Sequence, residues 1–374
     1  MNLLELPLPA GDIAGFDIDY PASAGSSRIK VSRKDWSKYD GIRLIGKGPG
    51  KTFIRPNVGF TTSDDATINL GLESGFVQIE SATIVCGPTM GIRAGLATKG
   101  QWAQKRPETP MTLKLVDYEI LAEEKSMWGV FGYQSDGIFE HGVYNCFELR
   151  EHGNYFHGWG EKGVSFDYIE FNSVGAECIK ARCDPSEIEF TPNALVSVKH
   201  TNFRDWYQPH SSRGGGGLVL QGSHAHVHVA DSMFYGDLID PGRAKCFMVD
   251  DNGDKGHYGM GGIFNEGAAT GHILIERTGI QGVAKEWFGE IAAVQSIRAT
   301  GRITDLAQSL RVIDCGIYGD NTLFKIDGID KVFFINNNTP EIKKIALARG
   351  FNTTTDTQLA PKDLPLLPIN NYVS

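Results

Sequence analysis

Three side chains of different chemistry occupy related positions in successive segments of the sequence. Asp167, Lys199 and His228 supply a carboxylate, an ammonium and an imidazole. Such a set could abstract a proton from an acidic sugar and protonate the leaving oxygen, which is general acid–base catalysis. We therefore predict these three as catalytic residues, with His200 and Asp231 at their edge as substrate-binding residues. The alternative is a solvated ion pair between Asp167 and Lys199, which would contribute little energy.

An irregular segment between 203 and 217 combines aromatic and charged residues. Flat rings suit sugar faces, and the charged groups offer directional hydrogen bonds. A run of glycines at its end lets the chain return close to the neighbouring structure. The residues that we predict to bind substrate here are Arg204, Asp205, Trp206, Tyr207, His210 and Arg213. A structural loop whose aromatic residues cover the core fits the sequence equally well.

Two further segments contain groups that could bind a metal or supply paired carboxylates. The segment 250–262 contains several aspartates, but no glutamate closes it as in an EF-hand, so we expect a solvated turn there. Bound Ca²⁺ is the alternative, and no other cofactor is expected. The segment 147–163 lacks the HExxH order of zinc proteases. Glycoside hydrolysis stays open because Glu148 or Glu151 could face Asp167 or Asp205 across a groove.

A short apolar pattern recurs along the chain and must position these residues. Each unit has two apolar residues separated by one residue and a third apolar residue five positions after the second. Seven segments fit: VQIESATI (77–84), LKLVDYEI (113–120), VSFDYIEF (164–171), VSVKHTNF (196–203), VHVADSMF (227–234), ILIERTGI (273–280) and LRVIDCGI (310–317). The units start between 31 residues (196 to 227) and 51 residues (113 to 164) apart. This range is natural for coils that carry loops and too irregular for leucine-rich or helical repeats.

The spacing within each unit indicates a strand followed by a bend. The first two apolar residues alternate with period two, which places them on one inner face. The sequence therefore predicts an all-β fold, a single-stranded right-handed parallel β-helix (solenoid) with capping segments at both ends. Successive rungs lie about 4.8 Å apart, so Asp167, Lys199 and His228 should share an outer wall. An antiparallel sandwich or a propeller would not give this register and spacing.

The repeats divide the chain into three segments. We expect an N-terminal cap or attachment segment over 1–40, the β-helix over 41–335, and a C-terminal cap and tail over 336–374. The end coils of a solenoid must shield their core and strand edges, which is the expected role of both caps. Within the C-terminal cap, the segment IKKIALAR (342–349) is predicted to be helical.

The segment GIRLIGKGPGKTFIRP (41–56) resembles the opening coil of the pectate-lyase-like superfamily of right-handed β-helices. In that superfamily a glycine-rich turn joins two strands, as it would here. The resemblance implies a polysaccharide ligand, and in the lyases a Lys or Arg base with acidic calcium ligands. This chain departs from the pattern because no aspartates cluster on successive strands. A phosphate-binding loop is excluded because Ile45 stands where the Walker motif needs glycine.

Composition narrows the range of partners. The 374 residues carry a formal net charge of −9 without a run of basic residues, so we expect no nucleic-acid partner. The N-terminus has neither the basic nor the apolar region of a signal peptide, and no stretch is apolar enough to cross a membrane. The six cysteines lack paired metal-ligand spacing, and buried free thiols are expected.

Three functions of different class fit these observations. The first is a phage virion protein of the tailspike or tail-fibre type, a homotrimer that binds a host surface polysaccharide and could depolymerise it. The missing secretion signal favours this hypothesis, since a virion protein needs no export. The second is a secreted polysaccharide lyase or glycoside hydrolase. The third is a non-catalytic structural β-helix protein of a larger assembly, so whether the chain is an enzyme stays open. All three place the protein on a virion or outside the cell.

Overall fold

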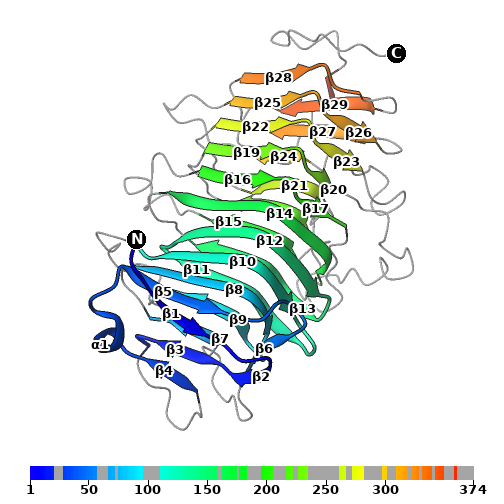
Figure 1. Ribbon diagram of the computed structural model, residues 1–374. Coiled ribbons are helices and arrows are strands. Elements are labelled where there is room, and N and C mark those ends of the chain that lie inside the picture. Colours follow the sequence, from blue (N-terminus) through cyan, green and yellow to red (C-terminus); the bar gives the residue numbers. More distant parts are fainter. Residues whose placement is uncertain are drawn as a thin grey trace, which may run out of the picture.

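The strands of this chain stack into a column of parallel coils. The structure is a computed structural model. It describes residues 1–20, 28–56, 66–71, 75–95, 110–157, 162–174, 177–182, 195–204, 216–221, 226–234, 261–266, 272–281, 297–300, 309–318, 322–327, 331–338, 342–348 and 358–359. Figure 1 shows the rungs in chain order, from the blue N-terminal strands at one end to the orange C-terminal strands at the other.

Each coil contributes strands to two sheets. Each coil begins with one strand of the first sheet. In chain order these strands are β1 (Leu3–Pro7), β5 (Gly41–Ile45), β8 (Phe76–Val85), β10 (Thr112–Leu121), β12 (Asp136–Cys146), β14 (Gly163–Val174), β16 (Leu195–Lys199), β19 (His226–Ala230), β22 (His272–Glu276), β25 (Ser309–Ile313) and β28 (Lys331–Ile335). Where the bend interrupts the strand, the same sheet continues with β2 (Gly11–Ala14), β6 (Thr52–Arg55), β17 (Asn202–Phe203), β20 (Met233–Phe234), β23 (Gly279–Gln281) and β26 (Gly316–Tyr318).

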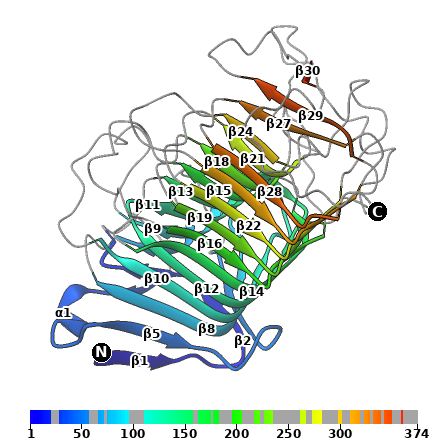
Figure 2. The same cartoon turned by 90° about the horizontal axis from the view of Figure 1, so that it is seen from above.

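The second sheet closes the coils on the other side of the core (Figure 2). Its strands are β3 (Phe16–Ile18), β4 (Ile29–Val31), β7 (Ala66–Leu70), β9 (Met90–Ala94), β11 (Ser126–Tyr133), β13 (Leu149–His157), β15 (Glu177–Arg182), β18 (Gly216–Gln221), β21 (Gly261–Glu266), β24 (Ile297–Thr300), β27 (Thr322–Asp327), β29 (Ile342–Ala348) and β30 (Gln358–Leu359). Described pairings are parallel except that of β29 with β30. The predicted all-β parallel β-helix is therefore confirmed.

The apolar positions of the repeat form the core. Val198 of β16 and Val229 of β19 are fully buried, as are the third positions Phe203 and Phe234. Phe203 stacks on Phe234 with ring centroids 4.2 Å apart, and Phe171 stacks on the other face of Phe203 at 4.9 Å. Identical positions on successive rungs are thus direct neighbours, because the coils stay in register.

A coil in the middle of the repeat region does not follow the sequence pattern. β12 lies in register between β10 and β14, within the 51-residue gap between two repeat units. Gly137 occupies the position where the other units have an apolar residue. A Cβ atom at Gly137 would lie 2.7 Å from the Phe139 ring and 2.8 Å from the Phe156 ring. The two phenylalanines therefore fill the space that an apolar side chain takes in other rungs.

The bend in the first sheet has the same backbone conformation on each described rung from β8 to β28. The residue at the bend has a positive φ of 45° to 56° in nine successive rungs: Ser81, Asp117, His141, Tyr168, His200, Asp231, Arg277, Asp314 and Asn336. The side chain of the next residue bonds to the end of the strand that precedes the bend. Thr201 and Ser232, for example, donate hydrogen bonds to the carbonyl oxygens of Lys199 and Ala230.

The two ends of the column differ from the predictions in detail. β1 and β2 pair with β5 and β6, so the first 40 residues add a rung of the coil as well as the short helix α1 (Arg33–Trp36). The predicted C-terminal helix over 342–349 is wrong. β29 is a strand because it pairs with β27, and the open edge of that sheet supplies the backbone hydrogen bonds that override helix propensity. The segment boundaries at 40 and 335 stay predictions.

The glycine-rich segment after β5 behaves as a turn between two strands. Gly48 and Gly50 have φ values of 125° and 72°, which favour glycine over other residues. The segment that follows is the strand β6 and not the helix that a phosphate-binding loop requires. Among the described residues, no helix has the length and apolar character to cross a membrane.

Candidate functional site

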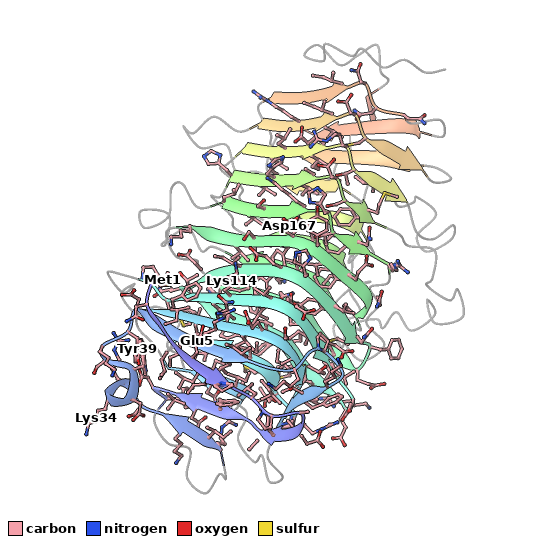
Figure 3. All side chains as sticks on the ribbon, in the orientation of Figure 1. Met1, Glu5, Lys34, Tyr39, Lys114 and Asp167 are labelled. Carbon is pink, nitrogen blue, oxygen red and sulfur yellow. The ribbon has the colours of Figure 1, made fainter. Side chains whose placement is uncertain are left out.

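The predicted catalytic residues lie on one face of the first sheet. Asp167 of β14, labelled in Figure 3, is opposite Lys199 of β16 in the parallel register. His228 of β19 is opposite Ser197, and so lies one rung further on and two residues back. All three side chains are partly exposed and alternate with buried neighbours, which puts them on the outer wall.

Two members of this trio are engaged with residues outside it. The Asp167 carboxylate lies 2.8 Å from Nδ1 of His200, and Nε2 of His228 lies 2.9 Å from the Glu276 carboxylate. Lys199 Nζ makes no ion pair or hydrogen bond within the described part of the chain. The trio shares a wall as predicted, but its members form no bonds with one another there. Their catalytic role stays a prediction.

The other predicted binding residues fall partly on this wall. Asp231 accepts two hydrogen bonds from Arg277, which lower the pKa of its carboxyl group. Hydrogen bonds from His228 and Arg277 lower the pKa of the neighbouring Glu276 in the same way. Arg204 is exposed, with Nε 3.3 Å from Glu170. Asp205, Trp206, Tyr207, His210 and Arg213 lie outside the described residues, as does most of the segment 250–262.

The second sheet carries a set of titratable and aromatic residues that the sequence did not reveal. We call it the β13 cluster, and it comes from three neighbouring strands, β11, β13 and β15 (Figure 2). Its members are Trp128, Phe131, Tyr133, Glu151, His152, Tyr155, His157, Glu177 and Lys180. The parallel register sets His152 opposite both Trp128 and Glu177, and Tyr155 opposite Lys180.

Charged groups form a chain from the surface to the interior of this cluster. The indole N–H of Trp128 donates to the Glu151 carboxylate at 2.9 Å. Nε2 of His152 lies 3.9 Å from Glu151, and its Nδ1 lies 2.7 Å from the Glu177 carboxylate. Lys180 Nζ lies 3.6 Å from Glu177. The side chain of Glu151 is 26% exposed, whereas that of His152 is 4% exposed.

The buried carboxylate of Glu177 is held in its charged form. Burial alone would raise the pKa of Glu177, but the nearby charges of His152 and Lys180 outweigh burial and lower it. The Glu177 carboxylate lies 2.7 Å from Nδ1 of His152, and Nε2 on the other side of the ring faces Glu151 at 3.9 Å. A carboxylate that orients an imidazole in this way is a recurring arrangement in acid–base catalysis.

Aromatic rings surround the charged chain. The Trp128 ring stacks on Phe131 at 5.1 Å, and Tyr155 meets Phe131 edge-on at 5.5 Å. The Tyr155 ring also lies 4.9 Å from the His152 ring, and its hydroxyl lies 3.4 Å from Nδ1 of His157. The cluster thus places a phenol, an imidazole and an ammonium together beside largely buried aromatic rings. Sugar-binding sites use the same combination of flat rings and a few polar groups.

The sequence contained one signal for this cluster. Phe131 and Tyr133 alternate on β11, and Tyr155 and His157 alternate on β13, as outward residues of a strand do. The segment 147–163, which contains Glu151, His152 and His157, matches no zinc-protease motif. Their partners Glu177 and Lys180 come from the next coil, and only the register of the second sheet brings them together.

The fold defines the chain as a parallel β-helix protein. No protein-family model matches the sequence, and no curated protein sequence is similar to it. Among solved structures, the chain is similar to an alginate lyase from Paenibacillus sp. str. FPU-7, with 10% sequence identity and a TM-score of 0.35. The match covers 94% of this chain and 92% of that chain. At that TM-score it carries no argument about the site or its substrate.

Proposed function

We propose that this protein binds an acidic polysaccharide and cleaves it by β-elimination at the β13 cluster. The observation that carries the proposal is the arrangement of Tyr155 and Lys180 on opposing strands beside the His152–Glu177 pair. A lyase acting on uronate chains needs a base, an acid and a positive charge for the sugar carboxylate. The cluster offers each of these within the aromatic surroundings that suit a sugar.

Each step of the elimination has a candidate group. Nε2 of His152 removes the proton from the sugar carbon next to the carboxylate, because its Nδ1 is already held by Glu177. The electron pair forms the new carbon–carbon double bond as the bond to the glycosidic oxygen breaks. Tyr155 donates a proton to that leaving oxygen. Lys180 stabilises the negative charge that builds up on the uronate carboxylate during proton removal.

The first test compares the β13 cluster with the wall of Asp167, Lys199 and His228. The substrates are alginate and polygalacturonate, and the measurement is the ultraviolet absorbance of unsaturated uronate products. We expect Tyr155→Phe and Lys180→Gln each to lower the rate at least about 100-fold, the usual size of an acid–base contribution. The double variant Lys199→Ala/His228→Ala serves as the matched control on the wall.

The outcomes separate the hypotheses, provided that thermal unfolding shows each variant to be folded. Loss of activity only in the wall variant would reject the β13 cluster and support the trio predicted from the sequence. Release of reducing ends without unsaturated products would identify a glycoside hydrolase instead. Binding or cleavage of no polysaccharide would favour the non-catalytic structural protein.

The polysaccharide ligand is common to a virion spike and to a secreted enzyme. A tailspike or tail fibre would be a homotrimer attached to other virion proteins, whereas secreted enzymes of the resembled superfamily usually act as monomers. The mass of the chain is 40.9 kDa. Sedimentation at about three times this mass would support the spike, and sedimentation at the monomer mass would support the secreted enzyme.

A further inference from the structure

Three aromatic rings stack on one another along the bend of the first sheet. His141, Tyr168 and His200 come from successive rungs, and we call them the ring ridge. The His141 and Tyr168 centroids are 5.1 Å apart with the rings 12° from parallel, and those of Tyr168 and His200 are 4.5 Å apart at 11°. All three side chains are exposed, and Tyr168 keeps 52% of its surface accessible.

The backbone at these positions does not favour the residues that occupy them. Left-handed φ suits asparagine and aspartate, which fill the equivalent position at Asp117, Asp231, Asp314 and Asn336. Tyr168 has a φ of 56°, and a bulky residue there costs about 1 to 3 kcal/mol. The Tyr168 ring gains no burial that would offset this cost, so the stability of the fold does not explain a tyrosine at this position. Strained residues of this kind concentrate at binding sites.

The stacking determines what the ridge can contact. Each ring of the stack covers the face of its neighbour, so a ligand contacts the edges of the rings, where the imidazole nitrogens and the Tyr168 hydroxyl lie. The carboxylate of Asp167 holds Nδ1 of His200. Beside it stands Lys199, whose ammonium has no bonded partner in the described part of the chain. A row of hydrogen-bonding edges next to the Lys199 ammonium matches an extended chain of hydroxyl and carboxylate groups.

We propose that the ring ridge is a second, non-catalytic binding site for an acidic polysaccharide. The proposal takes the ligand class from the proposed function, but it concerns a different sheet and different residues. The ridge lies at the bend of β12, β14 and the segment after β16, whereas the β13 cluster belongs to the second sheet. Because successive rungs lie about 4.8 Å apart, the edges of the three rings form a row along the column. A polymer held at the ridge stays close to the protein between cleavage events.

The test removes the rings without disturbing the bend. Asparagine is well suited to left-handed φ, so His141→Asn/Tyr168→Asn should fold at least as well as the parent protein. Asp314→Asn, at the same position on a distant rung, is the matched control. The measurement is affinity electrophoresis of the full chain in native gels that contain alginate, polygalacturonate or dextran.

We expect the parent protein and Asp314→Asn to be retarded by the two polyuronates, and the double asparagine variant to lose at least about 10-fold in apparent affinity, or 1.4 kcal/mol. Equal retardation of parent and double variant would overturn the proposal, and so would retardation by dextran as strong as that by the polyuronates. Failure of the proposed function has a different signature, since it is the absence of unsaturated products from the parent protein.

Discussion

At the scale of single residues, the charge on Glu177 links stability to pH. Its pKa in the folded protein lies below the ordinary value of 4.5, because His152 and Lys180 outweigh the effect of burial. The stabilisation is therefore complete above pH 4.5 and is lost as the pH falls through the folded pKa. We expect Glu177→Gln to cost about 3 to 5 kcal/mol at pH 7, since it leaves the buried ammonium of Lys180 without its carboxylate partner.

Denaturant unfolding at several pH values tests this expectation. The difference between the parent protein and Glu177→Gln should shrink as the pH is lowered below 4.5. Glu123→Gln is the control, because Glu123 is an ion-paired carboxylate whose side chain is 46% exposed. A stability difference for Glu177→Gln that does not change with pH would show that the carboxylate contributes through packing and not through its charge.

Residue positions were easier to predict than residue partners. The period-two pattern correctly placed Val198 and Val229 in the core and Asp167 and Lys199 on opposing rungs. It did not predict that Asp167 would bond to His200. His200 follows the strand at a bend with positive φ, and the alternation of side chains that holds within a strand does not extend through such a bend.

At the scale of elements, the N-terminal end of the column depends on a buried ion pair. Arg28 Nε lies 2.6 Å from the Asp17 carboxylate of β3, and both side chains are 1% exposed. Arg28 also donates hydrogen bonds to the carbonyl oxygens of Phe16 and Thr67, which joins β3 to β7. We expect Arg28→Met to destabilise the protein by about 3 to 5 kcal/mol, because it leaves a buried carboxylate without its cation.

An exposed arginine provides the comparison for this element. Arg55 bonds to Asp12 and Glu123, whose side chains are 64% and 46% exposed. Unfolding of both variants in urea measures the two losses, and we expect Arg55→Met to cost less than about 1 kcal/mol. Equal losses in the two variants would mean that burial of the Arg28 pair does not matter for the cap.

Elements were predicted well where their residues followed the repeat and poorly where they did not. Seven strands of the first sheet were found from their apolar spacing, but β12 was missed because Gly137 replaces an apolar residue. The helix predicted near the C-terminus is β29, whose pairing with β27 is a contact between coils that local propensity does not encode. For the same reason, the three strands that build the β13 cluster could not be aligned from the sequence.

At the scale of the whole molecule, a column of coils implies that stability is local. Each rung contacts only the rungs next to it, so the loss of one contact should weaken its neighbours and leave distant rungs intact. This property follows from the register of the coils. The position of the β13 cluster needed the second sheet as well, because its residues converge only when the coil closes.

Phe203 provides a direct test of local stability. Its ring lies between Phe171 and Phe234 in the core stack, and Phe203→Ala should cost about 3 to 5 kcal/mol. We expect amide hydrogen exchange to accelerate in β14, β17 and β20, while β5, β8 and β10 keep their protection. Phe139→Leu, which shortens a core ring several rungs away, should move the region of faster exchange toward β12. A uniform loss of protection along the chain would instead mean that the column unfolds as one cooperative unit, with every rung depending on every other.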